Sequence, residues 1–299
     1  MMTRRSGTTR RRRTRPIDAL LLVDKPAGIT SHDVVSVARR ALGERRVGHA
    51  GTLDPFATGL LVLLTGRATR VLPYVDGEPK VYEATIRWGS ETDTDDATGT
   101  ITRESPLVPS REAVDAAIAL LTGRIDQVPP DYSAKQVGGR RAHAAARGGA
   151  PLALAAVPVH VHGWTVREHR GSETDVTIVC GGGTYIRALA RDLGRAANGA
   201  AHLSALRRTR SGPFDLSGAT SFAELREGRA GLRSPREAIP SLPEQRVSAD
   251  DAARLAHGMR VDAGVEGERA ALVSGEGALL AIAERCAHQW QPRVVLAHG

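Results

Sequence analysis

The sequence predicts an α+β protein in which helices flank a sheet and a small β-rich module follows. Three observations predict this class. Segments such as Val81 to Gly89 alternate in the period of a half-buried strand. Segments such as Arg111 to Thr122 have the spacing of an amphipathic helix and lie between the strands. Residues 246–299 contain one short predicted helix, Asp250 to His257, and then strands separated by glycine turns.

The first elements are predicted by apolar runs and one capping motif. Order is expected to begin near Ile17, where DALLLVDKP has the pattern of a short buried strand that ends at a lysine–proline turn. Thr30 and Asp33 form a T-x-x-D capping box, which predicts a helix to about Leu42. The run GLLVLLTG then predicts a compact buried element, and SETDTDDATG an acidic turn after the 81–89 strand.

The middle of the chain interrupts this regular pattern. Residues 127–151 are rich in proline, glycine and basic residues, which predicts a surface insertion. VHVHGWTVREH and ETDVTIVCGG then predict a pair of strands joined across Arg170 to Ser172. A helix is expected from Thr184 to Asn198, directly after three glycines. Residues 214–244, with several prolines and glycines, are expected to be looser.

Composition narrows the class of protein. The 299 residues allow two domains. No apolar run reaches the roughly 18 residues of a spanning helix, and no signal peptide is visible, so we expect a cytoplasmic protein without a membrane partner. Two distant cysteines, Cys180 and Cys286, predict neither a disulfide framework nor a zinc site.

The net charge comes mostly from one end of the chain. The first 16 residues carry seven arginines and no acid, so subtracting these seven from the net charge of +8 leaves +1 for the rest. Residues 1–16 are predicted to be a disordered basic tail. The tail is either a solvated extension or a source of salt-sensitive affinity for nucleic acid, and these alternatives stay open. Global charge is therefore weak support for an RNA partner.

The most informative motif surrounds a single aspartate. GHAGTLDPFATGLL places Asp54 on a tight loop just ahead of a buried run, and TGRATR follows. An Asp-Pro turn could by itself be purely structural. Together with Lys80-Val81-Tyr82 and CGGGTYIRAL, however, the motif closely resembles the pseudouridine synthases, in particular the bacterial tRNA pseudouridine synthase B family. This resemblance covers roughly Asp18 to Phe214.

The resemblance implies a fold, a domain plan and a reaction. The fold would have a central mixed, mainly antiparallel sheet flanked by helices. Residues 17–244 would form the catalytic domain, and residues 246–299 a PUA-like RNA-binding domain. The reaction would isomerise the uridine at position 55, in the T-loop of transfer RNA, by base flipping and covalent catalysis. No cofactor or metal is expected, because this isomerisation has no redox or phosphoryl step.

Site residues also follow from the resemblance. It makes Asp54 the nucleophile, Arg187 its ion-pair partner and Tyr82 the residue that stacks on the base. In the substrate site, Tyr185 and Leu206 would line the pocket, Lys25 would lie close to it, and His49 would fill the gap left by the flipped base. Contacts with RNA are expected from basic residues of three segments: Arg70, Lys135, Arg140, Arg141, Arg147, Arg207 and Arg208.

The sequence departs from the family pattern at two positions. Many relatives carry a lysine where this chain has Gly182, so a contact made by that lysine could be missing. Relatives commonly have a tyrosine at the position of His143, a change that we do not expect to abolish binding.

The partner expected from the resemblance is the T-arm stem-loop of transfer RNA, bound by a monomer without a guide RNA.

Other signals are discounted and other functions stay open. His160 and His162 share one strand face but lack a third ligand, so exposed positions are expected. Asp93, Asp95 and Asp96 do not match an EF-hand, and a turn that bonds its own backbone is expected.

The alternatives are a non-catalytic RNA-binding or RNA-folding protein, a guide-dependent synthase, and a hydrolase that would need a second placed carboxylate. The sequence does not decide whether Asp54 attacks the anomeric carbon or carbon 6 of the ring.

Overall fold

The computed structural model describes residues 16–133, 135–137, 140–148, 150 and 152–297. Its main feature is an 11-stranded sheet whose principal path runs β14-β1-β3-β12-β4-β11-β10-β7. The strands of this path are β1 (Ala19–Lys25), β3 (Thr58–Thr65), β4 (Lys80–Trp88), β7 (Gly123–Gln127), β10 (Val157–Arg170), β11 (Glu173–Cys180), β12 (Ala201–Ser211) and β14 (Thr220–Ser221). Three short strands join the sheet off this path: β2 (Val47–His49), β13 (Phe214–Asp215) and β15 (Leu232–Arg233).

The sheet is mixed and mainly antiparallel, as expected. Among the described strands of this sheet, only β1 with β14 and β12 with β3 pair in parallel. Strands β10 and β11 form the predicted antiparallel pair, with Arg170 opposite Glu173. The region predicted to be loose supplies β13, β14 and β15, so residues 214–244 are more regular than expected. Very short strands escape sequence prediction because two residues carry no readable period.

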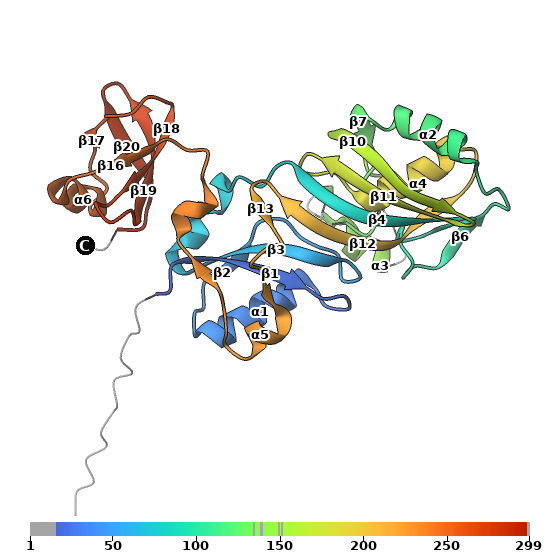
Figure 1. Ribbon diagram of the computed structural model, residues 1–299, viewed down its shortest axis with the longest axis horizontal. Helices are drawn as coiled ribbons and strands as arrows, with labels where there is room; N and C mark the ends of the chain where they lie inside the picture. The colour runs from blue at the N-terminus through green and yellow to red at the C-terminus, as the bar shows by residue number, and fades with distance from the viewer. Residues whose placement is uncertain (1–15, 134, 138–139, 149, 151, 298–299) are drawn as a thin grey trace, which may run out of the picture.

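Four α-helices pack against one face of the sheet, two on each half (Figure 1). The helices α1 (Ser31–Leu42) and α5 (Phe222–Arg226) cover β1 and β3, and α2 (Arg111–Leu120) and α4 (Ile186–Ala196) cover β4 on the same face, because Arg208 of β12 pairs both with Gly59 of β3 and with Tyr82 of β4. The predicted capping box starts α1: Thr30 and Asp33 exchange hydrogen bonds with each other's backbone. Leu21 and Val23 of β1 pack with α1, whereas Leu20 and Leu22 point into a different apolar cluster. Burial on both faces explains the continuous leucine run of β1.

A second core on the same face joins β4 to α2 and α4. Ile86 and Trp88 of β4 pack with Leu189 of α4 and Val114 of α2. This core fixes the N-terminal end of α4 over the middle of the sheet. Two small sheets complete this half: β5 (Ser90–Thr92) with β6 (Ile101–Glu104), and β8 (Gln136–Val137) with β9 (Arg140–Arg141), which is followed by α3 (Ala142–Arg147).

The end of the chain forms a separate five-stranded sheet with the order β16-β18-β19-β20-β17 (Figure 1). Its elements are β16 (Glu244–Arg246), α6 (Ala249–Ala256), β17 (Val261–Asp262), β18 (Arg269–Val273), β19 (Leu279–Cys286) and β20 (Gln289–Val295). Ile282 and Val294 pack with Leu20 and Ile239, so this sheet shares an apolar cluster with the main body. The 3-10 helices η1 (Gly66–Tyr74) and η2 (Pro235–Ala238) line the same junction.

The structure can be compared with the sequence for two features, membrane-spanning helices and metal sites. Among the described residues, no helix is long and apolar enough to cross a membrane. His160 and His162 are exposed on β10, as expected, with ring centroids 4.3 Å apart. No group of three or more metal-ligating side chains occurs in the described part of the chain.

Strands β3 and β12 meet at Gly59, where the two halves of the sheet join. Gly59 has φ +101° and lies opposite Arg208, so a Cβ there would collide with the carbonyl oxygen of Arg208. We expect Gly59→Ala to lower the free energy of unfolding by about 3 kcal/mol. Gly28→Ala is the matched control because Gly28 has φ +84° but no atom within 4 Å, so only about 1–2 kcal/mol of backbone strain is expected there. Equal losses in urea denaturation would contradict the steric explanation.

Candidate active site

The loop between β2 and β3 presents Asp54. Ser31, the first residue of α1, fixes the residue before it: the Ser31 hydroxyl donates to the Leu53 carbonyl at 3.0 Å and accepts from the Leu53 amide at 2.9 Å. On the other side, the amide of Ala57 donates to the Asp54 carbonyl at 3.1 Å. Leu53 is buried while the Asp54 side chain is 33% exposed. The loop therefore holds one carboxylate at the surface of the core.

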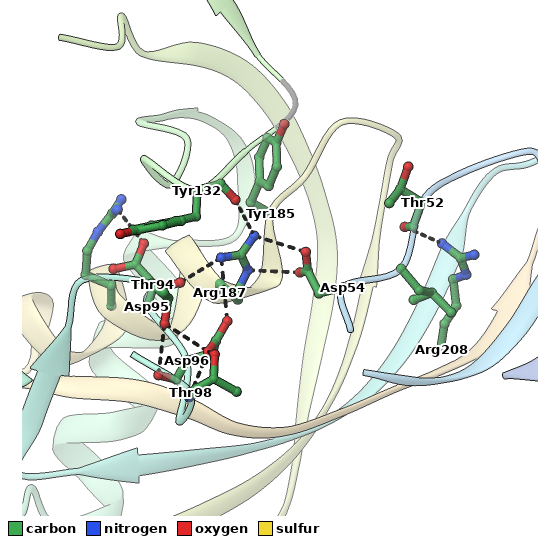
Figure 2. Close-up of polar contacts among 12 residues, drawn as sticks. Thr52, Asp54, Thr94, Asp95, Asp96, Thr98, Tyr132, Tyr185, Arg187 and Arg208 are labelled. Carbon is green, nitrogen blue, oxygen red and sulfur yellow. Dashed lines mark hydrogen bonds and ion pairs between the residues drawn. The ribbon is translucent and has the colours of Figure 1, made fainter. Parts of the chain in front are cut away.

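Arg187 binds this carboxylate with two parallel hydrogen bonds (Figure 2). Its Nε donates to Oδ2 of Asp54 at 2.9 Å, and its Nη2 donates to Oδ1 at 3.1 Å. The arginine side chain is only 5% exposed and lies at the start of α4. A bidentate arginine fixes both the position and the plane of a carboxylate. The structure thus brings together the two residues that the motifs suggested, although 133 positions separate them in the chain.

The remaining donors of Arg187 are also used. Nη1 donates to the Thr94 carbonyl at 2.7 Å, and Nη2 donates to the Tyr132 carbonyl at 3.0 Å. The carboxylate of Asp96 lies 3.6 Å from Nη1. A buried guanidinium is stable only when its charge and donors find partners. Arg187 is therefore held by contacts from three separate segments, as Figure 2 shows.

The acidic turn after β4 contributes to the site, which the sequence did not reveal. As expected, it bonds its own backbone and hydroxyls: Asp96 accepts from the Thr98 amide at 2.9 Å and from the Thr94 hydroxyl at 2.9 Å. However, Asp96 also faces Arg187, and Asp95 pairs with Arg191 at 2.8 Å. One sequence feature could have indicated this contact: the turn contains several acids, and α4 carries arginines spaced four residues apart on one face.

A cavity of about 260 Å³ opens beside Asp54. Tyr82, Tyr185 and Leu206 line it, as the motifs suggested. Its wall also contains residues that sequence reasoning did not assign to the pocket: Lys80, Tyr132, Ser133 and Thr184. The cavity thus combines aromatic and aliphatic surfaces with one carboxylate and its arginine, a pattern suited to a small flat ring that needs a few polar contacts.

Burial changes the acidity of the cavity tyrosines. It raises the pKa of Tyr82 above its ordinary value, with Arg208 as the main opposing influence. Burial likewise raises the pKa of Tyr185, opposed by a hydrogen bond to Ser133. Both phenols are therefore protonated near neutral pH. Gln127 positions Tyr185 by bonding its backbone amide at 2.9 Å and its carbonyl at 3.1 Å.

Lys25 lies beneath the Asp54 loop, close to the cavity, but it is not among the residues that line the cavity. Its side chain is fully buried, and its ammonium donates to the carbonyls of Pro26 at 2.9 Å, Ile29 at 2.8 Å and Pro55 at 3.2 Å. Burial lowers the pKa of Lys25 to about 8 in spite of the nearby Asp54 carboxylate. Because Pro55 directly follows Asp54, Lys25 supports the loop from beneath.

Arg208 is misassigned by the sequence, which suggested a contact with RNA. Its residue exposure is 1%, so it cannot offer a solvated charge to a phosphate backbone. The guanidinium donates to the carbonyls of Leu60 at 2.8 Å and Gly51 at 2.9 Å, and more weakly to Thr52. Figure 2 shows the contact with Thr52 on the far side of the loop from Arg187. Arg208 therefore ties the Asp54 loop to the sheet.

This scaffold role predicts a loss of stability. Arg208→Met would leave the Leu60 and Gly51 carbonyls without a donor, so we expect the free energy of unfolding to fall by about 3 kcal/mol. Arg207→Met is the control: Arg207 is half-exposed and pairs with Asp24 at 2.7 Å, so about 1 kcal/mol or less is expected. Urea denaturation measures both. A larger loss for the Arg207 variant would contradict this explanation.

The other residues suggested for RNA binding lie outside the cavity. Arg70 and Arg140 are exposed, Arg207 is half-exposed and Lys135 is partly buried. Arg70 also donates to the Val295 carbonyl at 3.1 Å, in the last strand of the C-terminal sheet. The side chains of Arg141 and Arg147, and residues 1–15 of the basic tail, lie outside what the structure describes.

The surroundings of His49 and Gly182 bear on two expectations from the sequence. His49 does not line the cavity, and its Nδ1 is buried with no hydrogen-bond partner among the described residues. Burial, followed by the charge of Arg208, lowers the pKa of His49, which favours a neutral ring. At Gly182, a side chain would collide with the Glu78 carboxylate, and the Lys80 ammonium lies 3.5 Å from the Cβ position. Glu78 and Lys80 thus occupy the place that the lysine of many relatives would need.

Comparison with known families matches most of the chain. The model of the TruB family pseudouridylate synthase N-terminal domain matches residues 39–186, and that of the tRNA pseudouridylate synthase B C-terminal domain matches residues 187–234. A tRNA pseudouridine synthase B of Arthrobacter sp. is 47% identical over 83% of each chain. Those of Thermobifida fusca and Nocardia farcinica are 45% and 44% identical, over 94% and 99% of this chain and 99% and 98% of theirs.

Comparison with solved structures concerns the fold alone. The structure of an H/ACA ribonucleoprotein bound to a substrate RNA containing 2'-deoxyuridine has a TM-score of 0.69 at 22% identity, covering 93% of this chain and 84% of that chain. The crystal structure of an archaeal box H/ACA Nop10–Cbf5 complex has a TM-score of 0.69 at 23% identity, covering 93% and 85%. The α+β architecture, including the second β-rich unit, therefore agrees with the expected fold.

Proposed function

Because the chain belongs to the TruB family of pseudouridylate synthases, we propose that it isomerises uridine 55, in the T-loop of transfer RNA, to pseudouridine. The single observation that carries the proposal is the Asp54–Arg187 pair at the wall of a cavity lined by Tyr82, Tyr185 and Leu206. Relatives that share 41–47% of their residues with this chain carry the name tRNA pseudouridine synthase B.

The reaction breaks the bond between the ribose and a ring nitrogen and makes a bond to a ring carbon. One carboxylate can act as a covalent catalyst that stays attached while the uracil turns over. Asp54 is proposed to attack either the anomeric carbon of the ribose or carbon 6 of the ring. Arg187 keeps the carboxylate directed toward the cavity, and its bonds to Thr94 and Tyr132 prevent the pair from swinging away.

Tyr82 is proposed to hold the extruded uracil by stacking. Tyr82 lies on β4 and lines the cavity together with residues at the start of α4. The raised pKa of Tyr82 favours this role over removal of the proton from ring carbon 5, because a base must first be deprotonated. Stacking needs only the face of the ring and is independent of the hydroxyl.

Binding of transfer RNA is proposed to use shape and phosphate contacts around the cavity. His49 would fill the gap left by the flipped base, which suits its neutral ring. Among the described arginines proposed as contacts, Arg70 and Arg140 are exposed and the Arg207 side chain is 37% exposed. We propose that residues 127–151 clamp the T-arm, that residues 246–299 form a PUA-like contact, and that a monomer acts without a guide RNA. Affinity should then fall as salt rises.

Release of tritium from ring carbon 5 tests the function. Transfer RNA transcribed with tritiated uridine should release about one tritium per molecule at saturation, because one position is modified. The control is the same transcript with cytidine at position 55, labelled only in its uridines, and it should release none. Binding without release would instead favour a non-catalytic tRNA-folding protein, and release of free uracil would indicate a hydrolase.

A further inference from the structure

Three arginines on one side of α4 face acids of the turn after β4. Arg187, Arg191 and Arg195 are spaced four residues apart, so they follow one face of the helix. Arg187 meets Asp54 and Asp96, Arg191 meets Asp95 at 2.8 Å, and Arg195 meets Glu91 at 2.6 Å. The first arginine belongs to the active site already described. The second carries a further inference because of what else it contacts.

The Asp95–Arg191 pair is almost completely enclosed. The two side chains are 8% and 10% exposed, whereas Arg195 is 54% exposed. Arg191 also donates through Nη2 to the carbonyl of Val128 at 2.9 Å and through Nε to Asp192 at 2.9 Å. Asp95 adopts a left-handed backbone conformation with φ +58°. An enclosed pair of this kind stabilises little by itself, but it specifies one arrangement of the segments that it joins.

Arg187 and Arg191 hold the same two segments: residues 128–132 and the acidic turn after β4. Arg191 binds the Val128 carbonyl and Arg187 binds the Tyr132 carbonyl, so one helix holds both ends of residues 128–132. This short segment leads from β7 into the insertion proposed to clamp transfer RNA. Arg191 and Arg187 also hold neighbouring residues of the acidic turn, through Asp95 and the Thr94 carbonyl.

The acidic turn is also hydrogen-bonded to β12, a strand that contributes to the cavity wall. The amide of Leu203 donates to the Asp95 carbonyl at 3.1 Å, and the amide of Ala97 donates to the Leu203 carbonyl at 2.9 Å. Leu203 lies on β12, three positions before Leu206 of the cavity. A shift of Asp95 would therefore act on the cavity wall, on Arg187 and on the root of the insertion together.

We propose that Asp95 and Arg191 are positioning residues that lock the root of the insertion, residues 128–132, to the acidic turn and so keep Arg187 and Asp54 aligned while transfer RNA is clamped. The proposal rests on the proposed function. Neither residue reaches the cavity itself. Their effect must therefore pass through Arg187 and through the segment that both arginines hold.

Single-turnover tritium release by Asp95→Asn tests this role. Asparagine keeps the size of the side chain and removes its charge, so Arg191 loses its ion pair with Asp95, keeping the one with Asp192, while the turn keeps its shape. The rate constant at saturating enzyme should fall about tenfold at pH 7.5, with the dissociation constant for transfer RNA changed less than threefold, because the phosphate contacts lie elsewhere. The double variant Asp95→Asn/Arg191→Met should be no slower than the slower single variant, since the residues act as a unit.

The pH dependence separates positioning from a merely structural effect. Burial raises the pKa of Asp95 to about 6, with Arg191, Arg187 and Arg195 lowering it and Asp192 raising it. The carboxylate is charged above this pH and the pair is intact, whereas protonation below it weakens the pair in the wild type. The ratio of wild-type to Asp95→Asn rate constants should thus shrink from about ten at pH 7.5 toward one at pH 5. Any other pH effect on the rate constant that the wild type and Asp95→Asn share cancels in this ratio.

The control is Glu91→Gln, which removes the buried carboxylate that pairs with the half-exposed Arg195 and Arg103 and touches neither residues 128–132 nor Asp54. Its rate constant should stay within twofold of the wild type. Limited proteolysis within residues 127–151 should be faster in Asp95→Asn than in the control, a readout that does not depend on catalysis. An unchanged rate constant in Asp95→Asn, a ratio independent of pH, or multiplicative losses in the double variant would overturn the proposal. An inactive wild type would refute the proposed function instead, and proteolysis would still decide whether the pair holds the insertion.

Discussion

Asp54→Asn is expected to lower the rate of tritium release from transfer RNA by roughly 10⁴-fold or more. The amide keeps the shape of the side chain but is too weak a nucleophile to form the covalent intermediate. Arg187 would still be able to donate one hydrogen bond to the amide oxygen, so the loop should keep its place. Single-turnover assays at saturating enzyme measure the loss, and a filter-binding assay should give a dissociation constant within a few fold of the wild type.

A neighbouring aspartate provides the control. Asp131 is exposed at the root of the insertion and is not among the residues that line the cavity. Asp131→Asn removes the same charge close to the site, and its rate should stay within about threefold of the wild type. If Asp54→Asn kept more than about a tenth of the wild-type rate, Asp54 could not be the nucleophile. Equal losses in both variants would point to a general electrostatic effect.

Arg187→Lys is expected to lower the single-turnover rate about a hundredfold. Lysine keeps the positive charge but cannot make two parallel bonds to Asp54 and also reach the carbonyls of Thr94 and Tyr132. The carboxylate would then sample orientations that do not face the reacting carbon, and misplacement of about 1 Å can cost 10²-fold. The effect should appear in the rate constant at saturation rather than in the affinity for transfer RNA.

The same helix supplies the comparison for this variant. Arg195 lies two turns further along α4, pairs with Glu91 at 2.6 Å and is 54% exposed. Arg195→Lys should leave the rate within about twofold of the wild type, because lysine keeps the charge beside Glu91 and Arg195 contacts neither Asp54 nor residues 128–132. Thermal melting checks that both variants are folded. A folded Arg187→Lys enzyme with wild-type rate would show that charge alone suffices and that the bidentate geometry is dispensable.

Much of the site could be predicted because its residues lie in contiguous motifs. The strand that contains Tyr82 and the helix that contains Arg187 were predicted correctly, and the buried run predicted after Asp54 forms β3, since each motif includes the local element that presents its side chain. The capping box at Thr30 and Asp33 was also correct, because a cap depends on residues only three positions apart. Local order of this kind is encoded by sequence spacing.

Arg207 and Arg208 show where local reasoning fails. Both lie on β12, and the strand period places them on opposite faces, but it does not say which face is covered. Parallel pairing with Thr58 and Gly59 of β3 decides this, and it buries Arg208 among loop carbonyls while Arg207 stays half-exposed. The exact position of Lys25 was open for the same reason: a lysine that follows a buried strand can turn either toward a pocket or beneath a loop.

The sequence by itself determined the family motifs, the order of the main strands and helices, and the three residues placed at the centre of the reaction. Only the tertiary structure decided which charges are exposed and which are enclosed, including the Asp95–Arg191 pair and the hold of α4 on residues 128–132. The physical reason is that propensity and periodicity act over a few residues. The cost of burying a charge is met by partners that lie far away along the chain, such as Asp95, 96 positions from Arg191.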